Sequence, residues 1–328
     1  MCNVNIALLG FGTVGKGVFE TLQTYKQRIE RSIDADINVS TIVIQHPEKH
    51  RDYIPRTHIT SDINAILENP DIDIVFEAIV GKEPAFTYTK QCIQKGKSVI
   101  TANKEMFAHH GKTLKSLADE HHVALKYDAT TAGGIPIIQT IQELLNMNSI
   151  QKVEAILNGT SNYILTSMRD KGISFDAALE EAQQLGYAEA DPTNDIGGYD
   201  AFFKIMILSD LIYGDQPNWE NVEIKGIADT SGHTAKKRGD KHEKIKQIAT
   251  LYRSNKGIHA HVRPESIHNN HPLYSIEGVE NAVHVQTDII GGLTLTGPGA
   301  GAFPTASAMI EDLCIVMKEK RHHQLLQI

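Results

Sequence analysis

Residues 4–15 read VNIALLGFGTVG, an apolar run that ends in a loop with three glycines spaced as GxGxxG. The apolar half predicts a short strand, and helical spacing of apolar residues predicts a helix over Val18–Ile29. In this context Gly10 permits a tight turn, Gly12 lets the backbone approach a pyrophosphate, and Gly15 lets helix and strand pack closely. The segment therefore predicts a dinucleotide site rather than a merely tight turn. The cofactor-binding residues predicted in the loop are Gly10, Phe11, Gly12, Thr13, Val14 and Gly15.

Strand and helix patterns alternate from this loop to Leu145, which is typical of a parallel doubly wound sheet with ligands at the carboxyl ends of its strands. Thr101, Asn103 and Lys104 follow one such end. Lys104 could serve a reaction at the nicotinamide or be an ordinary surface lysine, and spacing alone leaves both interpretations open. The predicted strands are Ile37–Ile44, Ile72–Ile79, Ser98–Thr101 and Val123–Asp128, and the helices Ala85–Gln94, Met106–His121 and Ile137–Leu145.

The end of the second predicted strand bears on the choice of cofactor. An acid there would bind the ribose 2′-hydroxyl of NAD, but the position reads Gln45-His46. Asp34 and Asp36 precede the strand and so belong to its other end. With Lys49 and Arg51 close by, the sequence favours NADP and leaves NAD open.

A second domain begins near Ile150, where the pattern becomes α+β. The charge-rich segment Lys236–Lys246 predicts a solvated helix and loop, and Ala306–Met317 predicts a helix that returns to the first domain. The fold class is thus α/β, with an N-terminal Rossmann domain (1–130), a second α+β catalytic and dimerisation domain (131–302) and a returning C-terminal helix (303–328). The predicted elements of the second domain are the strands Gln151–Leu157, Ile245–Leu251, Ile258–Val262, Ala282–Asp288 and Leu293–Thr296 and the helices Tyr163–Asp170 and Phe175–Leu185.

Asp200 and Lys204 form the strongest candidate catalytic pair, because their i, i+4 spacing makes them neighbours on a helix. An ordinary surface ion pair is the common alternative. Here residues 201–203 and 205–208 are apolar and cover every side of the helix, a pattern of a buried helix. A buried lysine is costly unless paired, and its pKa is easily moved, as proton transfer near neutral pH requires. We therefore interpret both as site residues.

Composition excludes several classes of protein. The chain has 328 residues and a net charge of -8, so it lacks the basic surface that non-specific nucleic-acid binding needs. Its three cysteines have no CxxC spacing, and it contains neither a long apolar span nor a signal peptide. Adjacent histidines such as His109-His110 make poor chelating geometry. These features predict a cytoplasmic protein without membrane or nucleic-acid partners.

Several motifs together resemble the homoserine dehydrogenases, in the same order and at the same spacing over nearly the whole chain. The stretch GYAEADPTND, followed by Asp200 and Lys204, is specific to that family, whereas the glycine loop is shared by many dehydrogenases. The other matching motifs are GFGTVG, TANK, TTAGGIPII, NGTSNYIL and GPGAGAFPTASA. The resemblance implies reversible, NAD(P)-dependent reduction of L-aspartate 4-semialdehyde to L-homoserine, on the route to threonine and methionine.

The resemblance also implies roles for individual residues. Lys204 and Lys104 would share acid-base work and orientation, in a division that the sequence leaves open, and Glu189 would pair the substrate ammonium. The remaining substrate-binding residues would be Asp195, Asp200, Gly186 and Tyr187. Further cofactor contacts would come from Thr101, Asn103, Lys104, Asn158, Gly159, Thr160 and Gly301. A monovalent cation, Na⁺ or K⁺, would bind backbone carbonyls at Asp128, Thr131, Gly133 and Ile135.

Departures from the family pattern weaken particular expectations. Asp128 stands where glutamate is usual and Thr131-Ala132 replaces Val-Gly, which bears on the cation site. Gln45 and Pro298 each replace an arginine, and Gly81-Lys82 replaces Gly-Gly, which bears on cofactor affinity.

Two alternative functions are another Rossmann reductase of an amino-acid-derived carbonyl and a non-catalytic dinucleotide sensor. The first would not need the residues from Glu189 to Lys204 that this sequence contains. The second would need an added basic DNA-reading module, which this sequence lacks. Family members dimerise through the second domain, so a homodimer is expected. Because the chain ends at Ile328, soon after the returning helix, we also expect a short form without the C-terminal threonine-binding regulatory (ACT) domain.

Overall fold

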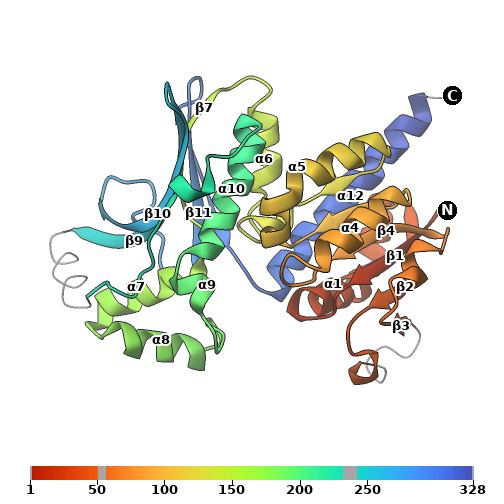
Figure 1. The fold of residues 1–328 in the computed structure, drawn as a ribbon, viewed down its shortest axis with the longest axis horizontal. Coiled ribbons are helices and arrows are strands. Elements are labelled where there is room, and N and C mark those ends of the chain that lie inside the picture. Colours follow the sequence, from red (N-terminus) through yellow and green to blue (C-terminus); the bar gives the residue numbers. More distant parts are fainter. Residues whose placement is uncertain (1, 51–56, 232–241, 327–328) are drawn as a thin grey trace. The chain divides into compact units, whose positions relative to one another are not determined.

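The structure, a computed structural model, describes residues 2–50, 57–231 and 242–326. The chain divides into two compact units, one made of Met1–Gly133 with Gly301–Ile328 and the other of Gly134–Ala300. Arg51, and most of the charge-rich segment around Lys236, lie outside the described residues. Each unit is described by itself (Figure 1).

The first unit is built on a parallel six-stranded sheet in the order β3-β2-β1-β4-β5-β6. This order, with β1 and β4 as neighbours at its centre, is that of a doubly wound sheet and confirms the predicted Rossmann class. The strands are β1 (Cys2–Leu9), β2 (Ala35–Val43), β3 (His58–Thr60), β4 (Ile72–Glu77), β5 (Ser98–Thr101) and β6 (Leu125–Lys126). The helices are α1 (Thr13–Thr24), α2 (Lys26–Ile33), α3 (Asn64–Leu67), α4 (Ala85–Gln94), α5 (Lys104–Glu120) and α12 (Ala302–Leu326), with 3₁₀ turns η1 (Pro47–Lys49) and η2 (Asp128–Thr130).

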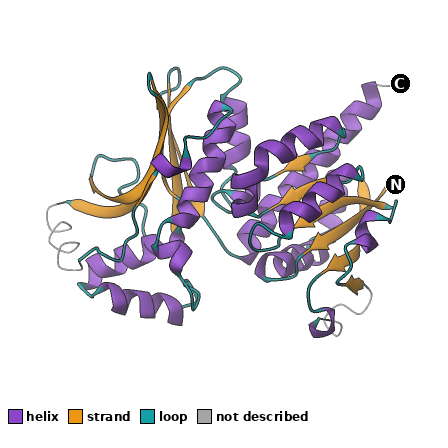
Figure 2. Ribbon diagram, viewed as in Figure 1, coloured by secondary structure: helices purple, strands orange, loops and turns teal. Residues whose placement is uncertain are grey.

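Helices cover both faces of this sheet, which is why the buried residues of its central strands are mostly apolar (Figure 2). One face packs against α1, α2 and α12, through residues such as Ile6, Leu22 and Leu313. The other packs against α3, α4 and α5, through residues such as Ala7 and Ile93. The return of the C-terminal helix to the first sheet is therefore confirmed.

The second unit contains a mixed six-stranded sheet in the order β12-β11-β7-β9-β10-β8. Neighbouring strands are antiparallel except β8 and β10. The strands are β7 (Ile150–Ile156), β8 (Glu223–Ile224), β9 (Glu243–Ser254), β10 (Gly257–His268), β11 (Glu280–Thr287) and β12 (Gly292–Pro298). The helices are α6 (Ile137–Leu144), α7 (Gly159–Lys171), α8 (Phe175–Gln184), α9 (Thr193–Ile196) and α10 (Tyr199–Tyr213), with the 3₁₀ turn η3 (Trp219–Asn221).

The helix α10 is the buried element that the sequence predicts. It packs against β9 and β10, and Phe202, Ile205 and Leu208 are almost fully buried. Positive φ at Gly198 and Gly214 marks its two ends, and a side chain at Gly198 would press on Val262 and Ile224. This helix fixes the position of the candidate catalytic pair.

Three expectations about elements are wrong. The segment predicted as one helix over Val18–Ile29 belongs to two helices, because the backbone of Tyr25 leaves the helical conformation between α1 and α2. Helix α1 also begins earlier than predicted, directly after the glycine loop. The strand predicted over Val123–Asp128 is reduced to β6, since Asp128 opens a 3₁₀ turn. Lys246, at the end of the segment expected to be solvated, is fully buried in β9, the strand that was predicted over Ile245–Leu251.

Candidate functional site

The glycine loop has the geometry of a phosphate cradle. Gly10 has φ +93°, and a Cβ there would lie 2.7 Å from the carbonyl oxygen of Ala78, so no other residue fits. At Gly12, by contrast, a Cβ would meet nothing within 4 Å, and α1 begins at the next residue. The open space beside a helix N-terminus suits a pyrophosphate. Phe11 is buried in this loop, and Val14 packs on the core beneath it.

The end of β2 carries the exposed residues Gln45 and His46. Asp34 lies at the opposite end, where it follows α2 and lies 3.7 Å from Arg321. Asp36 is also at that end, beside Asn3. Neither aspartate therefore reaches the edge of the sheet where a ribose would bind.

The ends of β4 and β5 are joined by a buried polar network. Thr101 Oγ1 donates to Glu77 Oε2 (2.5 Å) and accepts from the backbone N–H of Asn103 (3.0 Å). Asn103 Nδ2 donates to the carbonyls of Ile79 (2.8 Å) and Gly81 (2.7 Å), and Asn103 Oδ1 caps α5. Lys104, half-buried, is the first residue of that helix. The network therefore sets the position of Lys104.

Glu77 is the unusual member of this network, because its side chain has no exposed surface. Burial raises its pKa to about 7, although the hydrogen bonds from Thr101, Ile79 and Asn103 oppose the shift. Glu77 was not among the site residues predicted from the sequence. An acid closing the apolar strand IDIVFE at the ligand edge of the sheet is the signal that could have indicated it.

The loop after β6 contains the first residues of the expected cation site. Asp128, Thr131 and Gly133 are buried, and Ala132 and Gly133 have positive φ. Asp312 of α12 accepts the backbone N–H of Asp128 (3.1 Å). Burial, together with the charge of Asp128, raises the pKa of Asp312 to about 7. Ile135 is buried and belongs to the second unit, and Gly301, with φ +117°, precedes α12 in the first.

In the second unit, the N-terminus of α7 meets the acidic segment. Asn158 caps α7 by accepting from Ser161 N–H, and its Nδ2 donates to Asp195 Oδ1 (2.7 Å) and Asp200 Oδ2 (2.9 Å). Ser161 Oγ donates to the carbonyl of Asp195 (2.7 Å). Residues far apart in the sequence thus form one polar cluster.

Lys204 lies at the centre of this cluster. Its Nζ donates to Asp200 Oδ2 at 2.8 Å and to the carbonyl of Leu157 at 2.6 Å. The side chains of Lys204 and Asp200 are 7% and 4% exposed, so this is a buried pair and not a surface one. A lysine held in this way has a fixed direction and a low-dielectric environment, as proton transfer to a substrate oxygen requires.

The predicted substrate residues follow α8. Gly186 has φ +75°, and Tyr187 and Glu189 are exposed. Thr160 Oγ1 donates to the carbonyl of Tyr187 (2.6 Å), which ties this segment to the N-terminus of α7. Gln183 Nε2 donates to the carbonyl of Glu189 (3.1 Å). Of the predicted site residues, Asn158, Thr160, Asp195, Asp200 and Lys204 are thus brought together, while Glu189 lies on the same segment with its side chain exposed.

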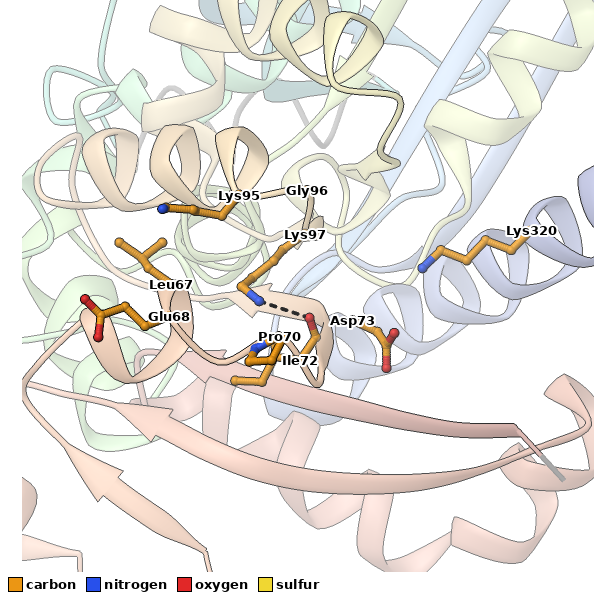
Figure 3. Close-up of a pocket in the computed structure, with 9 residues that line it drawn as sticks. All are labelled: Leu67, Glu68, Pro70, Ile72, Asp73, Lys95, Gly96, Lys97 and Lys320. Carbon is orange, nitrogen blue, oxygen red and sulfur yellow. Dashed lines mark hydrogen bonds between the residues drawn. The ribbon is translucent and has the colours of Figure 1, made fainter.

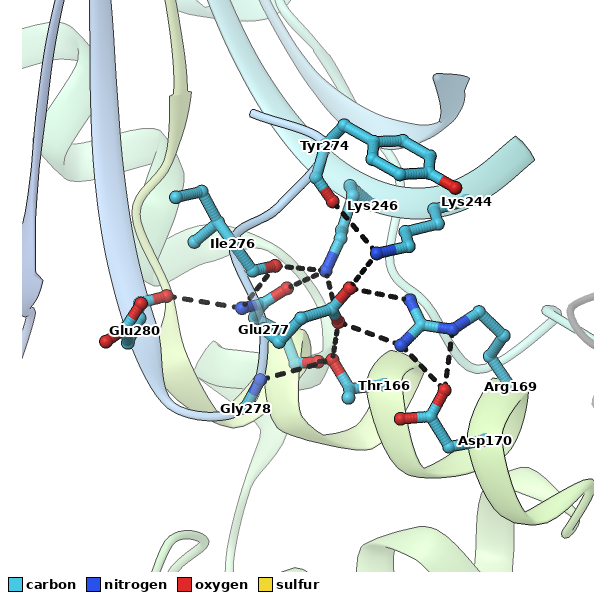
Figure 4. Close-up of polar contacts among 11 residues, drawn as sticks. Thr166, Arg169, Asp170, Lys244, Lys246, Tyr274, Ile276, Glu277, Gly278 and Glu280 are labelled. Carbon is cyan, nitrogen blue, oxygen red and sulfur yellow. Dashed lines mark hydrogen bonds and ion pairs between the residues drawn. The ribbon is translucent and has the colours of Figure 1, made fainter. Parts of the chain in front are cut away.

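A second charged network supports the cluster (Figure 4). Lys246, Lys244 and Arg169 surround the carboxylate of Glu277. Burial lowers the pKa of Lys246 to about 8. Burial alone would raise the pKa of Glu277, but the three cations lower it to about 2. Glu277 thereby holds the loop whose Val279 carbonyl packs on Gly159, with 2.6 Å to a Cβ placed there.

A pocket of about 380 Å³ lies elsewhere in the first unit (Figure 3). Lys97 lines it and donates to the carbonyls of Asn69 (2.6 Å) and Ile72 (3.2 Å), at the amino end of β4. This is the edge opposite to the glycine loop, so the pocket is not part of the candidate site. Within the described ranges, no group of three or more histidine, cysteine or acidic side chains could hold a metal ion, and no helix is long and apolar enough to cross a membrane.

Comparison with protein families matches both units. The family model for homoserine dehydrogenase matches residues 136–314, and that for the NAD binding domain of homoserine dehydrogenase matches residues 10–128. Homoserine dehydrogenase from Lactococcus lactis is 37% identical over 97% of this chain and 75% of its own length. The enzyme from Neisseria gonorrhoeae is 39% identical over 94% of this chain and 71% of its own length.

Solved structures agree with the family models. A homoserine dehydrogenase from Thiobacillus denitrificans superposes with a TM-score of 0.92 at 37% identity, over 98% of this chain and 74% of that one. A hyperthermophilic archaeal homoserine dehydrogenase in complex with NADPH superposes with a TM-score of 0.81 at 27% identity, over 97% and 98% of the two chains.

Proposed function

The chain belongs to the homoserine dehydrogenase family, and on this premise we propose how its residues divide the work of the reaction. As a member of the family it is an NAD(P)-dependent oxidoreductase that interconverts aspartate 4-semialdehyde and homoserine. The bound nicotinamide supplies or accepts the hydride. The protein must orient the substrate and supply or accept a proton at its oxygen.

Lys204 is the proposed proton donor, and the buried Asp200–Lys204 pair is the observation that carries this proposal. In the reducing direction, Nζ gives a proton to the oxygen that becomes the hydroxyl, while Asp200 and the Leu157 carbonyl fix its direction. Asn158 holds Asp200 and Asp195 in place from the other side. Lys104, at the N-terminus of α5, is the proposed second lysine.

Substrate recognition is proposed for the segment from Gly186 to Asp195. Glu189 is an exposed carboxylate on a segment that Thr160 holds through Tyr187, so it can pair the substrate ammonium. Asp195, held by Asn158 and Ser161, would line the same pocket.

NADP is the proposed preferred cofactor. The turn after β2 presents Gln45 and His46, and the two aspartates that could repel a 2′-phosphate lie at the other end of the strand. The variant Gln45→Asp should therefore lower kcat/KM for NADP about tenfold and leave that for NAD nearly unchanged. Equal effects on both cofactors would contradict this assignment.

A monovalent cation is proposed at the backbone carbonyls of the loop of Asp128, Thr131 and Gly133, where the buried Asp312 accepts the backbone N–H of the buried Asp128 and adds negative charge nearby. Ile135 as a fourth ligand, and the cytoplasmic location, stay predictions from the sequence. If the loop binds K⁺ or Na⁺, replacing both by a bulky ammonium ion at constant ionic strength should lower the unfolding temperature.

Homoserine oxidation, followed at the nicotinamide absorbance with NADP and with NAD, tests the function. L-Serine, one methylene shorter, is the matched control substrate, and we expect turnover with homoserine only. Absence of turnover with homoserine, or equal turnover with serine, would contradict the proposal.

A further inference from the structure

Glu77 connects the turns that follow β4 and β5 at the ligand edge of the first sheet, next to the glycine loop that follows β1. Its Oε1 accepts the backbone N–H of Ile79 at 2.7 Å, and its Oε2 accepts Thr101 Oγ1–H at 2.5 Å. The following residue, Ala78, donates to the carbonyl of Leu9 (2.8 Å) and packs on Gly10. The turns 79–81 and 101–104 therefore meet at this side chain, and the glycine loop contacts the backbone of the next residue, Ala78.

The hydrogen bonds run in one direction toward the carboxylate. Asn103 N–H donates to Thr101 Oγ1, and the Thr101 hydroxyl proton is then directed to Glu77. A carboxylate accepts at both oxygens, as this chain of donors requires, whereas a protonated acid or an amide would offer a proton where Thr101 already offers one. The ionised side chain thus matches the network.

The same side chain is a poor choice for stability. Its pKa, raised by burial to about 7, lies above the value in the unfolded chain. Such a group stabilises the folded state most below the unfolded pKa and loses that contribution as pH rises through about 7. Cys92 of α4 is the titratable neighbour that senses the charge of Glu77, and burial raises its pKa to about 12, so it is neutral at pH 8. A buried acid that lowers stability at the ligand edge of the sheet suits a role in binding.

We propose that Glu77 is a positioning residue for the nicotinamide dinucleotide, acting through Thr101 and Asn103 on the turns 79–81 and 101–104. It has no exposed surface and so does not touch the cofactor itself. Thr101 is also fully buried, and the Asn103 side chain bonds Ile79, Gly81 and the start of α5. These residues, named as cofactor contacts from the sequence, would then act by shaping the turns. The inference rests on the proposed function only for the identity of the cofactor, a nicotinamide dinucleotide.

The test measures binding of NADPH, and separately of NADH, by fluorescence titration of the purified protein without substrate. Glu77→Gln should weaken the Kd of the preferred cofactor about tenfold. Its unfolding temperature at pH 8 should equal or exceed that of the wild type, because the buried charge is gone. The cofactor KM should rise together with the Kd.

The matched control is Asp73→Asn, in the same strand. The Asp73 carboxylate also accepts a backbone N–H, that of Asn5 (3.0 Å), but at the opposite edge of the sheet. It should leave the Kd unchanged. Thr101→Val, which removes the linking hydroxyl, should reproduce the loss, and Thr101→Ser should restore affinity.

Wild-type affinity in Glu77→Gln, or equal loss in Asp73→Asn, would overturn the proposal. Should Glu77→Gln fail to fold, wild-type affinity in Thr101→Val overturns it instead. Because no substrate is used, these outcomes are independent of whether homoserine is oxidised.

Discussion

Lys204 is held by one carboxylate and one carbonyl inside a helix that is buried on nearly every side. The variant Lys204→Met fills a similar volume but cannot carry a proton, so kcat should fall about 10²-fold or more. Asp200 would keep its bond from Asn158, which limits the structural damage. The exposed Lys225 of the same unit provides the control variant Lys225→Met. Near-normal turnover in folded Lys204→Met, with cofactor binding retained, would remove Lys204 from the mechanism.

Glu189 differs from Lys204 in being exposed, which suits a residue that binds rather than transfers a proton. The variant Glu189→Gln loses the charge that pairs the substrate ammonium, so the homoserine KM should rise about tenfold while the cofactor KM stays constant. Steady-state kinetics, with homoserine and the cofactor varied in turn, measures the two KM values separately. A rise confined to the cofactor KM would place Glu189 outside the substrate pocket. Glu180, an exposed residue of α8, offers the control variant Glu180→Gln.

The candidate site could be predicted only where its chemistry is local in the sequence. Asp200 and Lys204 are one helical turn apart among apolar residues, so both pairing and burial could be predicted. The role of Glu77 depends on Ile79 and Thr101, which come together only when β4 and β5 pair. No spacing rule connects them.

Helices and strands, too, could be predicted only where local sequence determines them. Helix α4 and strand β5 have the predicted bounds, because their patterns are regular and their ends are marked. Glu243, Lys244 and Lys246 were expected to be solvated because they are charged, yet they open β9, whose later part was predicted as the strand Ile245–Leu251. The pairing of Lys246 with Glu277, 31 residues later, is what makes its burial possible. Charge alone therefore indicated the wrong environment.

The loop held by Glu277 is an element whose stability can be tested directly. In Glu277→Ala the fully buried Lys246 loses its carboxylate, so the free energy of unfolding should fall by about 3 kcal/mol. The exposed pair of Glu223 and Arg263 supplies the control variant Glu223→Ala, expected to lose less than about 1 kcal/mol. Urea unfolding followed by the single tryptophan, Trp219, reports on this unit.

The acid dependence of that variant has a defined sign. The pKa of Glu277 is lowered to about 2, so its contribution to stability is present above the unfolded pKa of about 4.5 and is lost as pH falls toward 2. The wild type should therefore lose more stability than Glu277→Ala over that range. Equal losses in both would show that Glu277 is not paired as described. The substrate KM of Glu277→Ala should also rise, because the loop that Glu277 holds packs on Gly159.

At the scale of the whole molecule, the edge of the second sheet indicates self-association. Strand β12 has β11 on one side, and among the described strands none pairs with its other side. The turn that leads into it exposes Ile289 and Ile290, 59% and 53% accessible. Ile290 N–H donates to Asn148, whose neighbour Met147 is 78% exposed. An open edge beside exposed apolar side chains favours pairing with a second copy.

We therefore predict a two-fold homodimer that uses this region. Light scattering at micromolar concentration should report twice the chain mass of 36.2 kDa. The double variant Ile289→Glu/Ile290→Glu places like charges against each other across a two-fold interface and should shift the protein toward the monomer. The exposed Val80 of the first unit gives the control variant Val80→Glu, which should leave the dimer intact. A wild-type protein that scatters as a 36.2 kDa particle would disprove the dimer, and a double variant that remains dimeric would place the interface elsewhere.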